Sequence, residues 1–185
     1  MNLPSFFKDN SKSDKCEEAI DFFMSWTIRC ADVKYEKSFE RLNTYSKRIL
    51  AKLIGDCDGG EKQFGEIKVW KQSGNIDLWV EFEILQTGEQ IALIIENKMY
   101  SEIRPGQLEK YRDQALEYYE ELDSRRIIYI LLRPDYEINN KNGEKKECQA
   151  LGYRYLNLEE LKDTLDEVKT GNDLFDEFWF NWHEA

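Results

Sequence analysis

The sequence is poor in the residues that build zinc sites and membrane spans. It has one histidine, His183, and its four cysteines (Cys16, Cys30, Cys57 and Cys148) are scattered with no C-x-x-C pair. This pattern argues against a zinc site and favours reduced thiols. No apolar run is long enough to cross a bilayer, and the chain does not begin with a positively charged segment and an apolar core. We therefore expect a cytoplasmic protein with no membrane partner.

Positive charge is also scarce. The chain carries 26 Lys and Arg against 37 Asp and Glu, which gives a formal net charge of −11. This balance counts against broad contact with nucleic acid, because phosphate backbones are held mainly by Lys and Arg. A local basic strip can still coexist with an acidic remainder. The candidates for such a strip, each of which is more simply a solvated surface residue, are Lys47, Arg48, Lys52, Arg104, Lys141, Lys145 and Lys146.

Apolar and aromatic residues are plentiful, at 41% and 14%, which excludes a disordered chain. We predict a single domain over residues 1–185, with a helical lead-in over about 1–34 and an aromatic C-terminal helix over about 172–185. The aromatic helix is expected to be core or a self-association face rather than a platform for stacking bases, since such stripes are usually buried. Its apolar residues are Leu174, Phe175, Phe178, Trp179 and Trp182.

Hydrophobic periodicity predicts an α/β fold. Strands are expected over 66–71, 74–84, 91–98, 126–132 and 151–156, and helices over 13–30, 33–54, 105–123 and 158–168. The segment 135–149 is polar and predicts a loop or a hairpin tip. The first three strands form an antiparallel meander, and the next strand follows a helix as a parallel, right-handed crossover. The sheet is therefore mixed and flanked by helices.

The hairpin formed by the second and third strands organises this interpretation. If its turn is centred on residues 87 and 88, the antiparallel register places Asp77 opposite Lys98 and Trp79 opposite Glu96. Since side chains alternate along a strand, Asp77, Glu96 and Lys98 then emerge on one face within cross-strand or diagonal reach. The pattern thus predicts two carboxylates and an amine at one end of a buried strand.

Charges at such a position are costly unless they are paired or bind a metal ion. Two carboxylates suit Mg²⁺, and a lysine beside them suits a phosphate or an attacking water. The simpler interpretation is a cross-strand ion pair between Asp77 and Lys98, with Glu96 a solvated strand end.

The same residues resemble a known signature. Asp77, a spacer of eighteen residues and then Glu96, Asn97 and Lys98 are similar to the motif of the PD-(D/E)xK nuclease superfamily, with Ile76 where the motif has Pro. The resemblance implies a restriction-endonuclease-like fold. It also implies that Asp77, Glu96 and the backbone carbonyl of Asn97 bind Mg²⁺, which Mn²⁺ can replace, and that Lys98 assists catalysis.

Two further features extend the resemblance, which spans about residues 35–161. Gln107 and Tyr111 form a Q-x-x-x-Y pattern after the motif, and in several branches of the superfamily these residues line the active site. Members also commonly place an acidic residue on the helix before the first strand, and Glu40 is the best match, with Glu36 as its rival. An exposed salt-bridge partner is an equal interpretation of both.

The resemblance implies a metal-dependent endo- or exodeoxyribonuclease that hydrolyses phosphodiester bonds of DNA, in defence, restriction or repair. A homodimer would supply two active sites for cutting both strands. The alternative, motivated by the acidity, is a catalytically weak or inactive nuclease-fold protein that serves as an interaction module. A glycoside-hydrolase carboxylate pair is a third interpretation, and the adjacent Lys98 argues against it.

Overall fold

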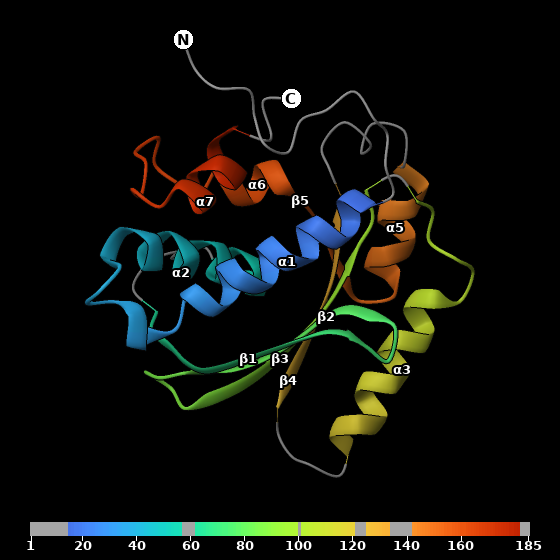
Figure 1. The fold of residues 1–185 in the computed structure, drawn as a ribbon. Coiled ribbons are helices and arrows are strands. Elements are labelled where there is room, and N and C mark those ends of the chain that lie inside the picture. The colour runs from blue at the N-terminus through green and yellow to red at the C-terminus, as the bar shows by residue number, and fades with distance from the viewer. Residues whose placement is uncertain (1–14, 57–61, 100, 121–124, 134–141, 182–185) are drawn as a thin grey trace.

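A five-stranded mixed sheet runs through the protein (Figure 1). The computed structural model describes residues 15–56, 62–99, 101–120, 125–133 and 142–181, and it leaves the side chains of residues 15, 16, 120 and 142 undescribed. The strands, in the spatial order β1-β2-β3-β4-β5, are β1 Phe64–Ser73, β2 Ile76–Ile84, β3 Glu89–Asn97, β4 Arg126–Arg133 and β5 Tyr153–Asn157. The first three pair antiparallel, and β3, β4 and β5 pair parallel. The predicted α/β fold is confirmed.

Helices cover both faces of this sheet (Figure 1). On one face lie α1 (Lys15–Cys30) and α2 (Glu40–Ile54), and on the other lie α3 (Gln107–Glu120) and α5 (Asn142–Ala150). The remaining helical segments are η1 Val33–Tyr35, α6 Leu158–Lys162, α7 Asp173–Asp176 and the π-helical turn η2 Glu177–Asn181. Within these described ranges, no helix is long and apolar enough to cross a membrane.

The strand β3 has a continuous apolar run because helices cover both faces of the sheet. Leu93 joins the core beneath α1 and α2, whereas its neighbours Ala92 and Ile94 join the core beneath α3. A strand that is buried on both faces needs apolar side chains on both. At its end the alternation directs Glu96 toward the α3 face and Asn97 toward the α1 face.

The register of the β2/β3 hairpin corrects the prediction. Leu78 pairs with Ile95 and Trp79 with Ile94, so the same register extended by one residue brings Asp77 level with Glu96. The expected pairings of Asp77 with Lys98 and of Trp79 with Glu96 were wrong by two residues. The turn occupies the four residues 85–88 and not a pair centred on 87 and 88. Because side chains repeat every two residues along a strand, the predicted face is unchanged.

Several element boundaries also differ. The predicted helix over 33–54 is a short 3₁₀ turn followed by α2, and Phe39, expected in its buried stripe, is 55% exposed. Part of the expected loop over 135–149 is α5, and residues 135–141 lie outside the described ranges. The helix predicted over 158–168 ends at Lys162, although its capping box between Asn157 and Glu160 is present.

The C-terminal aromatic segment is core, as expected. Phe175, Phe178 and Trp179 are buried in the cluster beneath α1 and α2, and Phe178 stacks on Phe23 with ring centroids 4.7 Å apart. Leu174 is half exposed, and Trp182 lies outside the described residues. Base stacking on the three buried rings is therefore excluded.

Candidate active site

The start of β2 and the end of β3 bring Asp77 and Glu96 together. The two strands are antiparallel, so these positions meet at one end of the sheet. The backbone N–H of Asn97 donates a hydrogen bond of 2.8 Å to Asp77 Oδ2, which fixes that carboxylate against β3. Glu96 is only 2% exposed. The two predicted acids are thus adjacent, and a buried carboxylate of this kind needs partners.

One oxygen of Glu96 has those partners and the other does not. Oε1 accepts hydrogen bonds from Lys98 Nζ at 2.7 Å and from Gln107 Nε2 at 2.6 Å. Oε2 is buried and has no hydrogen-bond partner among the residues that the structure describes. An unpaired carboxylate oxygen beside a second carboxylate is a position that a cation would satisfy.

The Q-x-x-x-Y pair also lies at this site. Gln107 Nε2 donates to the hydroxyl of Tyr111 at 3.0 Å as well as to Glu96, and the Tyr111 hydroxyl donates to the Asn75 carbonyl at 2.7 Å. The first turn of α3 is therefore tied to the β1/β2 turn and to the end of β3. The structure brings Asp77, Glu96, Lys98, Gln107 and Tyr111 together, as the sequence predicted.

The expected helix acid does not lie there. Glu36 pairs with Lys47 Nζ at 2.8 Å, and Glu40 begins α2 beside a separate hollow that Arg41 and Asp166 help to line. Neither residue is among the main groups that shift the pKa of Asp77 or of Glu96. The structure therefore gives no support to Glu40 or to Glu36 as a metal-supporting residue.

The helix α1 supplies two acids that the sequence interpretation missed. Asp21 is 3% exposed, and its Oδ1 accepts a hydrogen bond of 3.3 Å from Asn97 Nδ2. Glu17, one turn earlier, accepts from the Met99 N–H at 2.8 Å and from the hydroxyl of Ser101 at 2.7 Å. Their spacing of four residues beside the apolar stripe of α1 was the available signal, since it places two acids on one helix face.

Burial is the main cause of raised pKa values at Glu96, Asp21 and Asp77. Burial and then the charge of Asp77 raise the pKa of Glu96 to about 8, against the lowering effect of Lys98. Burial and again Asp77 raise the pKa of Asp21 to about 7. The pKa of Asp77 is raised mainly by its own burial. Such a cluster binds protons readily at neutral pH and is stabilised by added positive charge.

Lys98 remains charged in this setting. Burial lowers the pKa of Lys98, but the charge and the hydrogen bond of Glu96 raise it by more, so the net shift is upward. Its side chain is 12% exposed, which leaves the ammonium shielded from solvent. Lys98 is therefore a hydrogen-bond donor and a positive charge at neutral pH, and not a base.

The available donor atoms fit a hard cation such as Mg²⁺. Asp77 and Glu96 offer carboxylate oxygens, and Glu96 Oε2 is unpartnered among the described residues. Across the same part of the chain, no group of three or more His, Cys, Asp or Glu side chains is arranged to hold a metal ion. Two carboxylates are nonetheless sufficient, because Mg²⁺ keeps several water ligands and needs few protein groups. The ligand role of the Asn97 carbonyl stays a prediction.

We expect the substitution Asp21→Asn to stabilise the metal-free protein at alkaline pH. A carboxyl whose pKa is higher in the folded chain stabilises the fold below its unfolded pKa, near 4, and this contribution is lost as the pH rises through the folded value of about 7. Asn cannot ionise and can still accept the hydrogen bond from Asn97.

Urea unfolding in EDTA is the measurement for Asp21→Asn. The free energy of unfolding of the variant should be close to that of the wild type near pH 4 and exceed it by about 4 kcal/mol at pH 8, because a rise in pKa from near 4 to about 7 corresponds to that free energy. Glu18→Gln, at an exposed position of the same helix, is the control and should show no such divergence. Parallel curves for Asp21→Asn and the wild type would contradict the raised pKa.

Among the described candidate basic residues, Arg104 lies next to this site, because its backbone N–H donates to Gln107 Oε1 at 3.1 Å, and the others lie on α2 or α5. Lys47 and Arg48 lie on α2 and pair with Glu36 and Asp166, whereas Lys145 and Lys146 lie on α5, beneath the other face of the sheet. Lys141 lies outside the described residues. The predicted basic strip is thus divided between the two faces.

Comparison with known proteins agrees with this arrangement. A scan against protein-family models matches residues 15–177, most of the 185-residue chain, to the PD-(D/E)XK nuclease superfamily. Searches of curated proteins and of solved structures found no match. The matched range contains the five residues gathered where β2 begins and β3 ends, together with Glu17 and Asp21. The chain belongs to the PD-(D/E)XK nuclease superfamily.

Proposed function

We propose that this protein is a Mg²⁺-dependent nuclease that hydrolyses phosphodiester bonds of DNA. The observation that carries the proposal is the pairing of two carboxylates, Asp77 and Glu96, beside the buried ammonium of Lys98. Membership of a nuclease superfamily supports the reaction class. The choice of DNA, the metal requirement and a role in defence, restriction or repair are part of the proposal.

The carboxylates of Asp77 and Glu96 would hold the metal ion. When bound, Mg²⁺ neutralises charge on the phosphate and makes a water ligand more acidic. The Asn97 N–H orients Asp77, and Gln107 together with Lys98 orients Glu96, so each carboxylate is fixed before substrate arrives. Preorganised groups of this kind need little rearrangement during the reaction.

Lys98 would act on the phosphate. Its Nζ holds three N–H donors, of which one is used at Glu96 Oε1. The others can donate to a non-bridging phosphate oxygen or to the attacking water, and the positive charge favours the more negative transition state. Tyr111 and Gln107 close the side of the site next to α3, where their mutual hydrogen bond keeps the amide of Gln107 directed at Glu96.

Cleavage of supercoiled plasmid and of single-stranded DNA, with Mg²⁺, Mn²⁺ or EDTA, tests the proposal. We expect metal-dependent cleavage that falls by about a hundredfold or more in Lys98→Ala, since loss of one preorganised donor to a transition-state charge costs that much. Lys110→Ala, at an exposed position of α3, is the matched control and should cleave at the wild-type rate. Cleavage that survives in Lys98→Ala would point to a contaminating nuclease.

The acidity favours a second candidate, an interaction module that keeps the fold without the activity. The net charge is −11, and the candidate cations are divided between the two faces of the sheet. The two functions differ in metal affinity, because a working site should bind Mn²⁺ or Mg²⁺ through Asp77 and Glu96. Calorimetry that detects no binding at millimolar metal, together with no cleavage of either substrate, would select the interaction module.

A further inference from the structure

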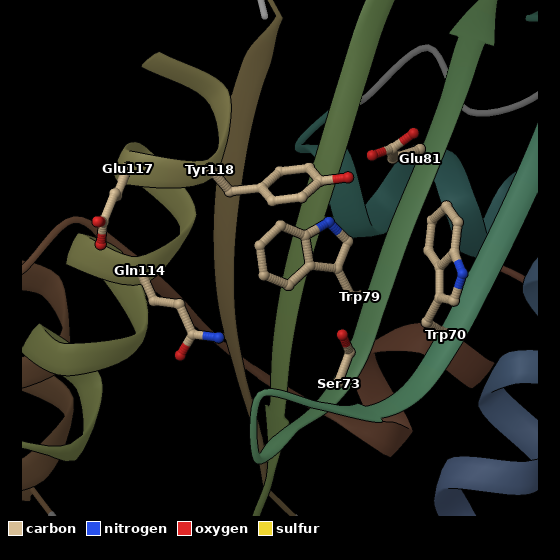
Figure 2. Close-up of a pocket in the computed structure, with 7 residues that line it drawn as sticks. All are labelled: Trp70, Ser73, Trp79, Glu81, Gln114, Glu117 and Tyr118. Carbon is tan, nitrogen blue, oxygen red and sulfur yellow. The ribbon is translucent and has the colours of Figure 1, made fainter. Parts of the chain in front are cut away.

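A cavity of about 450 Å³ opens between the β1/β2 hairpin and α3 (Figure 2). Its aromatic lining is Trp70 of β1, Trp79 of β2 and Tyr118 of α3, and its polar lining includes Glu81, Gln114 and Glu117. The volume lies within the usual range of small-molecule sites. The proposed catalytic residues do not line this cavity, so it is separate from the candidate active site, although both lie on the same face of the sheet.

Trp79 forms a fixed wall of the cavity. It is 6% exposed, and its Nε1–H donates a hydrogen bond of 2.7 Å to the hydroxyl of Tyr119. That hydroxyl donates to Glu81 at 2.8 Å, and Arg125 pairs with the other oxygen of Glu81 at 2.8 Å. A chain of hydrogen bonds of this kind holds the indole ring in one orientation without a ligand.

The other two aromatic rings are exposed. Trp70 lies directly across from Trp79 in the β1/β2 pairing and is 43% exposed, and Tyr118 is 53% exposed. The Tyr118 ring meets Trp79 edge to face, with centroids 5.1 Å apart, and Figure 2 shows Trp79 with Tyr118 over it and Trp70 beside it. Exposed rings that gather around a cavity mark a binding site more often than isolated ones do.

The polar lining selects the kind of ligand. Glu117 offers a carboxylate that repels phosphate and accepts hydrogen bonds from amino groups, whereas both oxygens of Glu81 already bond Tyr119 and Arg125. Gln114 adds an amide that both donates and accepts. Flat aromatic walls with hydrogen-bonding groups at the rim suit a nucleobase, which has two π faces and a polar edge. Adenine, cytosine and guanine carry an exocyclic amino group that can donate to Glu117, whereas thymine does not.

The cavity adjoins the candidate active site. Trp79 is two residues beyond Asp77 on the same face of β2, a separation of about 7 Å along the strand. A side-chain atom added at Gly74 would collide with the amide of Gln114, so the β1/β2 turn and α3 touch at the cavity rim. A nucleotide chain crossing Asp77 would therefore bring a base close to the aromatic walls.

We propose that this cavity holds an unpaired nucleobase of the DNA strand whose phosphate lies at the active site, an inference that rests on the proposed nuclease function. A base in a duplex cannot enter unless it leaves its stack and its partner. The protein should thus prefer single-stranded DNA, or a locally opened duplex, to fully paired DNA. Glu117 should favour oligo-dA or oligo-dC over oligo-dT.

Fluorescence anisotropy with dye-labelled oligonucleotides in EDTA tests the pocket without cleavage. Trp70→Ala should weaken binding of single-stranded DNA about tenfold, since stacking on one aromatic ring contributes on that order, and should change duplex binding little. Trp70→Phe keeps a ring and should restore most of the affinity. Phe39→Ala removes a similarly exposed ring at the start of α2, beneath the opposite face, and should bind like the wild type.

The outcomes separate this proposal from the nuclease function. If Trp70→Ala and the wild type bind single-stranded DNA equally well and the protein still cleaves DNA, the pocket proposal is wrong and the nuclease function stands. An equal loss for single-stranded and duplex DNA also overturns the pocket proposal, because a base-specific cavity would not act on paired DNA. If Trp70→Ala binds single-stranded DNA about tenfold more weakly but binds duplex DNA normally, and the wild type cleaves no DNA, the result supports the pocket and contradicts the nuclease function. A wild type that binds no oligonucleotide overturns both.

Discussion

The substitution Glu96→Gln is expected to slow DNA cleavage about a thousandfold and to leave the protein folded. Gln keeps the volume of the side chain and an oxygen that can accept from Lys98 and Gln107, so the hydrogen bonds at Oε1 survive. It removes the negative charge that the ionised carboxylate carries, and it turns Oε2, which has no hydrogen-bond partner in the described part of the chain, into an N–H donor that repels a cation. The loss is expected to be large because the charge acts in a buried site, where electrostatic effects are strong.

Single-turnover cleavage and metal-binding calorimetry measure this effect together. The variant should show both the loss of rate and the loss of detectable Mg²⁺ or Mn²⁺ binding, with an unchanged circular dichroism spectrum. Glu83→Gln is the matched control, because Glu83 lies on the same strand as Asp77 and bonds Gln90 at 2.9 Å, away from the site. A Glu96→Gln variant that cleaves at the wild-type rate would exclude this carboxylate from the active site.

The sequence predicted this pair of carboxylates through the wrong register. The expected turn was centred on residues 87 and 88, whereas the four residues 85–88 form it and Gly88 takes a positive φ of 71°. The difference shifts every partner by two residues and leaves every side chain on its predicted face. Register depends on turn geometry, which a glycine alone does not specify. The prediction that Asp77 and Glu96 lie close together still held, because it depended on the sheet face that their side chains occupy and not on the exact residue that each one pairs with.

The acids of α1 were not predictable in the same way. Glu17 and Asp21 reach β3 across more than seventy residues of chain, through contacts to Asn97 and Met99. Local periodicity identifies one face of a helix but does not identify the strand against which the face packs. The sequence therefore directed attention to α2, which precedes the first strand, although the acids at the site come from α1. Identifying these two acids required the knowledge that α1 packs against the end of β3.

The aromatic cavity illustrates the same limit. Alternation along β1 and β2 places Trp70 and Trp79 on one face, but Tyr118 approaches them only because α3 crosses that face. In contrast, Gln107 and Tyr111 were identified correctly because a spacing of four residues within one helix is a local relation. Local spacing was reliable in this chain, and relations between separate elements came from the structure.

A buried ion pair supports the backbone at Lys98, directly after the end of β3. Arg133, at the end of β4, is fully buried, and its guanidinium meets Glu144 of α5 through two hydrogen bonds of 2.5 and 2.7 Å. Its third nitrogen donates to the carbonyls of Ser101 at 3.1 Å and of Lys98 at 3.4 Å. Arg133 therefore links α5 to the backbone of Lys98 and Ser101, and we propose that it is a positioning residue for Lys98.

The substitution Glu144→Gln is expected to lower the free energy of unfolding by about 3 kcal/mol, because it leaves the buried guanidinium without the facing carboxylate. Urea unfolding measures the loss, and Glu147→Gln, at an exposed position of the same helix, should match the wild type. A single midpoint for all three proteins would show that the pair contributes nothing.

The double substitution Arg133→Leu with Glu144→Leu separates stability from positioning. It removes both charges together, so most of the lost stability should return. The carbonyls of Lys98 and Ser101 nevertheless lose their donor, and kcat for DNA cleavage should stay about tenfold below the wild-type value while KM changes little. Recovery of kcat together with stability would contradict the positioning role and would leave Arg133 as a purely structural residue. Recovery of stability alone would show that the end of β4 orients Lys98 through its backbone.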